Sequence, residues 1–186
     1  GEGKRNAPGS TVHSARKGRT MALSFNADEV LEMGLQIERN GSRFYRRAAE
    51  GATGPEVKQL LLELAEMEAD HEKLFAELKA KLPAGAAPEI AYDPHGETAL
   101  YLRAAADTHV FNTRREHPEL LSGKENPEEV LEIAIRFEKD SVVFFLGLKD
   151  MVPDGLGKAE VEWLIREEMN HVTSLSQTLE ALRSGS

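Results

Sequence analysis

The feature that most constrains this chain is a pattern of glutamate and histidine that occurs twice, with the copies 100 residues apart. In each copy a glutamate is followed thirty residues later by a Glu-x-x-His segment. The two copies consist of Glu38, Glu68 and His71, and of Glu138, Glu168 and His171. The same offset relates Phe44 to Phe144 and Leu64 to Leu164. The sequence therefore predicts a duplicated helical hairpin.

Capping residues and turn residues define the expected helices. An asparagine with a glutamate three residues later, just before an apolar run, is a helix N-terminal capping pattern. It occurs as Asn26 with Glu29 and again as Asn126 with Glu129. Segments rich in glycine and proline predict the turn inside each hairpin. We expect helices over about 27–51, 55–82, 127–150 and 157–183.

Within each hairpin the two glutamates are equally far from the turn. Glu38 and Glu68 each lie fifteen residues from Thr53, and the second copy has the same spacing about Pro153. In antiparallel helices that rise ~1.5 Å per residue, both glutamates are roughly 22 Å from the turn, so they face each other at one level. A shared metal site requires this arrangement.

The glutamates and histidines also occupy positions where a heptad-like pattern demands core residues. The apolar stripes of the second and fourth helices include Leu61, Leu64, Phe75, Leu82, Leu164, Leu175 and Leu182. One turn on either side of Glu38 lie Gly34 and Gly41, and Ala134 and Ser141 flank Glu138. Such small residues leave room for ions and a small oxidant, although close helix packing explains them equally well.

Four buried carboxylates without a counter-charge would repel one another and take up protons. Two divalent ions supply the missing positive charge, and the carboxylate and imidazole ligands suit iron, manganese or zinc better than calcium or magnesium. The alternative is that these are ordinary exposed carboxylates in a chain with 32 acidic residues. That alternative requires the spacing, the repeat and the apolar stripe to have arisen together by chance.

These residues resemble the ligand set of the ferritin-like di-iron carboxylate superfamily, and the chain over residues 26–183 is most similar to the rubrerythrin family. The resemblance implies an all-α, ferritin-like four-helix bundle of two hairpins, joined by a crossover at 83–126 that contains a short helix. It also implies that Glu68 and Glu168 bridge two iron ions. Glu38 with His71 would complete one ion, and Glu138 with His171 the other.

The resemblance further implies a redox enzyme that reduces hydrogen peroxide or dioxygen and works as a homodimer. The chain has no cysteine to hold a rubredoxin-type iron, so electrons are expected from an external protein such as a rubredoxin. Tyr45 matches a tyrosine common near rubrerythrin di-iron sites and is a candidate redox neighbour, although core packing would also explain it. Two alternatives stay open: a ferroxidase or iron-handling protein, and a non-enzymatic metal-binding bundle.

Three positions depart from related families. Rubrerythrins carry a further ligand glutamate where this chain has Ser141, and symerythrins carry one where it has Gly41. Without a spare carboxylate, each ion is expected to keep its histidine in both oxidation states. The haem-binding methionine of bacterioferritins is replaced by Ala69, so no haem is expected.

The composition of the chain argues against several other classes of function. The net charge of −9 argues against nucleic-acid binding, and no apolar run is long enough to cross a bilayer. The absence of cysteine excludes disulfides and iron–sulfur centres. We expect a cytoplasmic protein with no nucleic-acid or membrane partner.

The remaining expectations concern the N-terminal segment, the crossover and one tryptophan. Residues 1–25 are read as an N-terminal extension or a cloning remnant. The crossover shows a helical pattern over 97–111. Its histidines lack glutamate partners at ligand spacing and are expected to have surface or packing roles; they are His95, His109 and His117. Trp163, beside the stripe of the fourth helix, is expected to pack and not to transfer electrons.

Overall fold

Four long helices dominate the computed structural model. It describes residues 27–82, 97, 100–102, 104, 121–152, 155 and 157–185. The long helices are α1 (Ala27–Gly51), α2 (Pro55–Ala80), α4 (Pro127–Met151) and α5 (Lys158–Ser184). The described residues contain no strand. The all-α fold class predicted from the sequence is confirmed.

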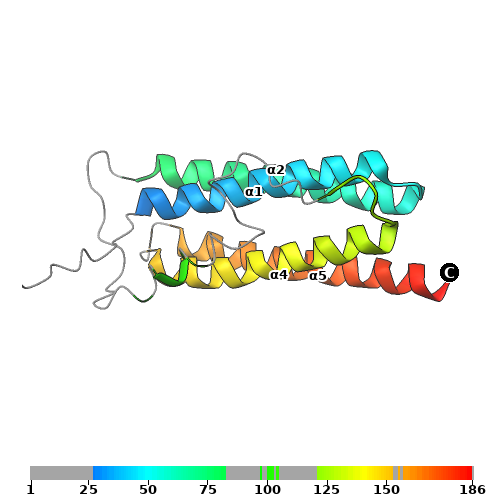
Figure 1. The fold of residues 1–186 in the computed structure, drawn as a ribbon. Coiled ribbons are helices and arrows are strands. Elements are labelled where there is room, and N and C mark those ends of the chain that lie inside the picture. Colours follow the sequence, from blue (N-terminus) through cyan, green and yellow to red (C-terminus); the bar gives the residue numbers. More distant parts are fainter. Residues whose placement is uncertain are drawn as a thin grey trace, which may run out of the picture.

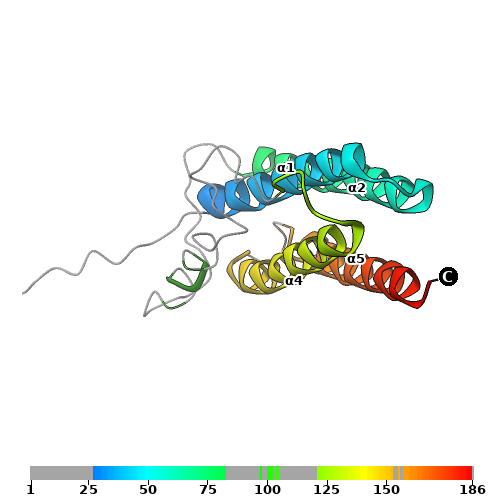
Figure 2. The same cartoon turned by 45° about the vertical axis from the view of Figure 1, so that its right-hand side comes forward.

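The helices are arranged as two hairpins lying along one axis, α1 with α2 and α4 with α5 (Figures 1 and 2). The colours in Figure 1 show that α1 and α5 run in one direction and that α2 and α4 run in the other. α2 ends and α4 begins at opposite ends of the bundle, so the segment between them connects its two ends. This is the topology of ferritin-like bundles.

The helix ends follow from local chemistry and differ from the expected ends by at most two residues. The Asn126 side chain accepts a hydrogen bond from the Glu129 amide at 2.9 Å, and the Glu129 carboxylate accepts one from the Asn126 amide at 2.8 Å. This is the expected capping box of α4. Its counterpart at Asn26 lies outside the described residues. At the other end of α2, Pro83 disfavours helical backbone in the preceding residue, so the helix ends at Ala80.

The residue before α5 must be a glycine for two reasons. Gly157 has φ of +117°, which side chains of L-residues rarely allow, and a Cβ atom there would lie 2.4 Å from Leu78 Cδ2. The close approach lets the start of α5 pack directly against the end of α2.

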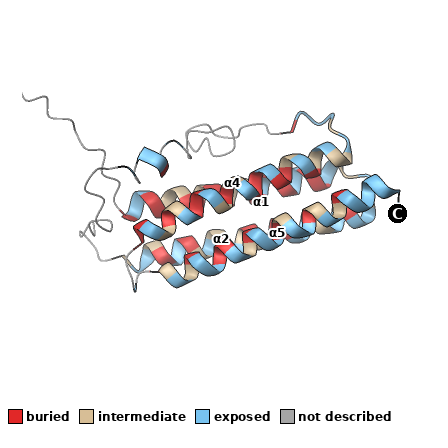
Figure 3. Cartoon of the chain, turned by 90° about the horizontal axis from the view of Figure 1, so that it is seen from below, coloured by how far each residue is buried: buried red, intermediate tan, exposed pale blue. Residues whose placement is uncertain are grey.

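Two apolar clusters fill the bundle on either side of its central level. One contains Phe75, Leu78, Phe145, Leu148, Val161 and Leu164, among others. The other contains Phe44, Tyr45, Leu61, Leu64, Leu131 and Leu175, among others. Figure 3 shows the buried residues along the inner faces of the helices. Leu182 departs from the predicted stripe: it lies in the last turn of α5, beyond both clusters, and is 36% exposed.

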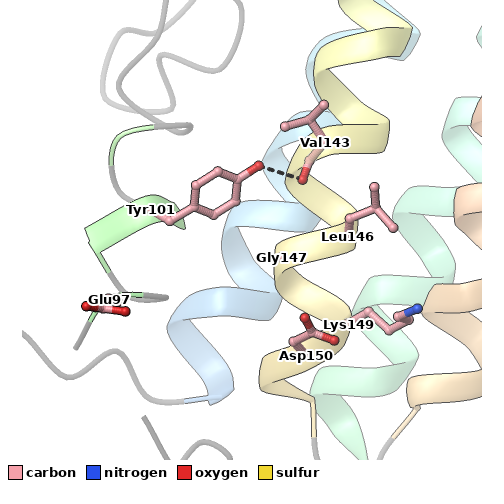
Figure 4. Close-up of a pocket in the computed structure, with 7 residues that line it drawn as sticks. All are labelled: Glu97, Tyr101, Val143, Leu146, Gly147, Lys149 and Asp150. Carbon is pink, nitrogen blue, oxygen red and sulfur yellow. Dashed lines mark hydrogen bonds between the residues drawn. The ribbon is translucent and has the colours of Figure 1, made fainter. Parts of the chain in front are cut away.

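The crossover is anchored on α4 (Figure 4). Glu97, residues 100–102 and Ala104 are helical, within the segment predicted to form the short helix. Leu102 is fully buried among the core residues. The Tyr101 hydroxyl donates a hydrogen bond to the Val143 carbonyl at 2.9 Å, and its ring occupies the space where a Cβ on Gly147 would be, 2.6 Å away.

Two of the expectations about outlying segments fall on residues that are not described. These are the N-terminal residues 1–25 and the crossover histidines His95, His109 and His117. In the part of the chain that the structure describes, no helix combines the length and apolar character needed to span a bilayer.

Candidate metal centre

The six predicted ligands meet at the middle of the bundle, between the two apolar clusters. Each helix contributes a glutamate, and α2 and α5 each add a histidine one turn further on. Every one of the six is at most 3% exposed. Their ligand atoms form two groups, within each of which all atoms lie within 4.8 Å of one another: Glu38, Glu68, His71 and Glu168, and Glu68, Glu138, Glu168 and His171. Glu68 and Glu168 belong to both groups, as bridging ligands would.

Each imidazole directs its Nδ1 atom toward the three carboxylates of its own group. His71 Nδ1 lies 3.1 Å from Glu168 Oε1, 3.5 Å from Glu38 Oε2 and 3.9 Å from Glu68 Oε2. A single ion at the centre of this group would contact one nitrogen and three carboxylates.

The second half of the site repeats this geometry. His171 Nδ1 lies 3.3 Å from Glu68 Oε1, 3.4 Å from Glu168 Oε2 and 3.5 Å from Glu138 Oε2. The His71 and His171 rings are stacked, with centroids 5.6 Å apart and an interplanar angle of 19°. The sequence repeat thus corresponds to a local twofold relation between two half-sites.

The small residues beside Glu38 have separate roles. A Cβ on Gly41 would lie 3.1 Å from Glu68 Oε2 and 3.0 Å from the Phe137 ring. Glycine at this position therefore preserves space around a bridging carboxylate. A Cβ on Gly34 would lie 2.6 Å from the Phe75 ring, so that glycine serves helix packing. Close packing thus explains Gly34, whereas at Gly41 a side chain would meet both a packed ring and a predicted bridging carboxylate.

Tyr45 connects the two hairpins through the site. It is fully buried on α1, and its hydroxyl donates a hydrogen bond to Glu138 Oε1 on α4. The Glu138 Oε2 atom is the one that faces His171. The repeat counterpart of Tyr45 is Phe145, which has no hydroxyl to offer Glu38. The two half-sites are therefore chemically unequal.

Burial makes the metal-free cluster retain protons. Burial, followed by the nearby Glu68 carboxylate, raises the pKa of Glu38 well above its ordinary value. Burial likewise raises the pKa of Glu138 to about 8. At His171 burial opposes the charged form, but the surrounding carboxylates outweigh it and raise the pKa to about 12. Positive charge is thus favoured at the centre of the cluster.

Unsatisfied polar atoms give a test of whether metal ions fit. Eight buried side-chain atoms of the six residues have no hydrogen-bond partner: Glu38 Oε1, Glu68 Oε1, His71 Nδ1, Glu138 Oε2, both Glu168 oxygens, and His171 Nδ1 and Nε2. Buried polar atoms are rarely left unpaired. Two divalent ions would offer partners to the two Nδ1 atoms and to the glutamates of both groups, and would balance four carboxylate charges. The mixed carboxylate and imidazole set suits transition metals.

A four-helix bundle with this buried set of glutamates and histidines defines the class of ferritin-like di-iron carboxylate proteins. Comparisons with known proteins agree. A family model described as Rubrerythrin matches residues 29–120. A ferritin-like diiron-carboxylate protein from Thermotoga maritima, solved as a crystal structure, is similar at 27% identity with a TM-score of 0.57; the match covers 88% of this chain and 98% of that one. A search of curated proteins found no match. The chain is a rubrerythrin-like member of the ferritin-like di-iron carboxylate superfamily.

One neighbour of the site has surroundings that the sequence did not indicate. Trp163, which was expected to pack, is 46% exposed, and its ring packs edge-on against the His71 ring with centroids 5.7 Å apart and an interplanar angle of 88°. The relative alignment of α2 and α5 along the bundle could have indicated that Trp163 lies at the level of His71. Because α2 and α5 are antiparallel and Glu68 lies level with Glu168, a residue five positions before Glu168 falls near the level of His71.

Replacing Tyr45 with phenylalanine tests the hydrogen bond to Glu138. The change leaves a buried carboxyl oxygen of Glu138 without its donor, so we expect the metal-free protein to lose about 1–3 kcal/mol of unfolding free energy. Urea denaturation of metal-free protein measures this. Tyr101→Phe is the matched control: it removes a hydroxyl that bonds a backbone carbonyl at an exposed position, and a smaller loss is expected. Equal losses in the two variants would show that the Tyr45 hydroxyl adds nothing specific to the site.

Proposed function

We propose that this protein is a di-iron oxidoreductase of rubrerythrin type that reduces hydrogen peroxide or dioxygen. The observation that supports it best is the division of six buried residues into two groups that share Glu68 and Glu168. Two bound iron ions supply the one-electron redox changes that such a reduction needs. In this proposal Glu38 and His71 complete the coordination of one ion, and Glu138 and His171 that of the other.

The contribution of the protein chain is geometry, charge and exclusion of water. Four glutamates balance the charge of two divalent ions, and the apolar clusters on both sides keep the site dry. The Tyr45 hydroxyl holds one oxygen of Glu138, which leaves the other directed toward His171. Gly41 keeps open the space beside Glu68. These features hold two ions close together with little rearrangement.

Electrons must come from another molecule in this proposal, because the chain has no cysteine that could hold a second iron centre. A rubredoxin-type protein is the donor we propose, and a homodimer is the assembly we propose from the rubrerythrin resemblance. Manganese and zinc are the alternative metals, and a zinc-loaded site would be redox-inactive.

A single-turnover experiment tests the function. Protein loaded anaerobically with two ferrous ions per chain is mixed with one equivalent of hydrogen peroxide, or with dioxygen, in a stopped-flow instrument. We expect one peroxide to oxidise both ions, consuming two protons and forming two water molecules. Reduced rubredoxin should then restore the ferrous state and allow further turnovers. Oxidation followed by release of iron from the chain would instead identify an iron-handling protein, and absence of any oxidation would leave a structural metal site.

A substitution at Ser141 tests why this chain differs from seven-ligand rubrerythrins. Ser141 is 1% exposed and lies one turn beyond Glu138 on the same face of α4. Ser141→Glu places a carboxylate there, and we expect peroxide turnover to rise on the order of tenfold, equivalent to about 1.4 kcal/mol of barrier. Ser141→Gln is the control of similar volume without the charge. A Ser141→Glu variant that folds, binds two irons and is no faster than Ser141→Gln would contradict the prediction.

A further inference from the structure

Trp163 joins the protein surface to the buried site. It is the only tryptophan in the chain and is 46% exposed on α5, while the His71 ring that it contacts is 3% exposed. The ring centroids are 5.7 Å apart in an edge-on arrangement. A single side chain therefore reaches from solvent to a residue of the metal centre.

The twofold relation of the two half-sites is broken at this position. The repeat counterpart of Trp163 is Glu63, whose carboxylate accepts a hydrogen bond from Gln59 at 2.8 Å on the surface of α2. The second half-site therefore has no aromatic ring in the equivalent place. His171 Nε2, moreover, is buried without a hydrogen-bond partner. The aromatic connection to solvent thus leads to the half-site of His71 and Glu38.

We propose that electrons from an external one-electron donor reach the metal centre past the Trp163 ring and through His71. This inference rests on the redox function proposed above. Electron tunnelling weakens exponentially with distance, so the shortest bonded or ring-to-ring path between donor and acceptor dominates the rate. Trp163 shortens that path by bringing a delocalised ring from the surface to within contact of His71, and the stacked His171 ring lies 5.6 Å further on.

The electron balance of the step is simple. Each donor molecule loses one electron and each ferric ion gains one, so two donors restore the diferrous site. Trp163 and His71 mediate the transfer and are left chemically unchanged. The competing role for Trp163 is that of a cover that shields His71 from water. A cover would affect metal retention and stability, whereas an electron path would affect the rate of reduction alone.

Single-turnover reduction separates these roles. Diferric protein is mixed anaerobically with reduced rubredoxin, and the loss of ferric absorbance is followed for wild type, Trp163→Leu and Trp163→Phe. We expect Trp163→Leu to slow reduction by about tenfold or more, equivalent to about 1.4 kcal/mol, and Trp163→Phe to lie between the two. Oxidation of the diferrous variant by peroxide should keep the wild-type rate, because that step needs no electron from the external donor.

Tyr101→Leu is the matched control, since it removes an aromatic ring of similar exposure, 41%, that lies against Gly147 and Val143. Its reduction rate should equal that of wild type. Wild-type reduction rates in Trp163→Leu would overturn the inference while leaving the proposed function intact. A Trp163→Leu protein that loses iron, or whose melting temperature falls with its reduction rate, would establish the cover role instead. A wild-type protein that peroxide and dioxygen fail to oxidise would overturn the proposed function and this inference together.

Tryptophan fluorescence tests the contact without turnover. Because the chain has one tryptophan, all of its tryptophan emission comes from beside His71. Titration of metal-free protein with Co²⁺ should quench the emission strongly, whereas Zn²⁺, which fills the same site without a partly filled d shell, should not. A Glu38→Ala variant, which weakens the half-site next to Trp163, should require more Co²⁺ for the same quenching. Emission that does not respond to Co²⁺ in wild-type protein would show that the ring contact is absent in solution.

Discussion

Replacing Glu168 with alanine is expected to lower the metal content of the protein from two divalent ions per chain to fewer than one. Glu168 belongs to both ligand groups, so its loss removes a ligand from each ion. It also removes one of the carboxylates that offset the repulsion between two nearby cations. Metal analysis of anaerobically purified protein, after dialysis against weak chelator, measures the result.

Two further variants make this prediction specific. Glu138 belongs to a single group, so Glu138→Ala should retain about one ion, the one next to His71. Glu167→Ala removes the neighbouring carboxylate, which is not in either group, and should retain both ions. Two ions bound to the Glu168→Ala protein would contradict the bridging assignment, as would equal losses in Glu138→Ala and Glu168→Ala.

Removal of the metal ions is expected to lower the melting temperature by roughly 10 °C or more at neutral pH. A ligand present at a thousand times its dissociation constant stabilises the folded state by about 4 kcal/mol, and each kcal/mol corresponds to about 2–4 °C for a chain of this size. Calorimetry of metal-free and zinc-loaded protein gives the difference, since zinc is free of redox side reactions. Equal melting temperatures would show that the carboxylates are solvated and do not need the ions.

The melting temperature of the metal-free protein should also fall as pH rises. Glu138 has an ordinary pKa of 4.5 that burial raises to about 8 in the folded protein, and the pKa of Glu38 is raised as well. The folded state therefore holds protons that the unfolded state releases. This contribution to stability is fully present below pH 4.5 and is lost as pH rises through about 8. His171, whose pKa rises from 6.5 to about 12, acts in the same direction at higher pH.

Metal binding reverses this trend because the ions replace those protons. The gap between the melting temperatures of zinc-loaded and metal-free protein should widen from pH 5 to pH 9. Glu38→Gln, which removes one buried charge while keeping its shape, should make the metal-free protein less sensitive to pH. A gap that narrows over this range would contradict the charge argument.

How much could be predicted from the sequence depends on which relation between residues is involved. Relations within one hairpin follow from helix rise and distance to the turn, and this arithmetic placed Glu38 level with Glu68. The capping pattern at Asn126 is local and was confirmed for the same reason. The apolar stripe indicated which residues are buried, but it wrongly included Leu182. The periodicity of one helix does not show where the neighbouring helices that cover it end.

Side-chain contacts between the two hairpins could be predicted from the sequence only as far as their level along the bundle. The contact of Tyr45 with Glu138 joins α1 to α4, and the contact of Trp163 with His71 joins α5 to α2. The repeat determines how each hairpin is built, but the rotation of one hairpin against the other depends on packing of the whole interior. Tyr45 was therefore noticed without its partner, and the exposure of Trp163 was missed.

The local twofold relation has a consequence for how such a site can arise. A single hairpin paired with an identical copy of itself would already assemble the same six side chains, since each hairpin supplies two glutamates and one histidine. In such a symmetric pair, every substitution appears on both sides at once. Joining the two hairpins in one chain allows either side to change alone, as at Tyr45 and Phe145 or at Trp163 and Glu63. In a fused chain, one half of the metal site can therefore specialise while the other half keeps its original form.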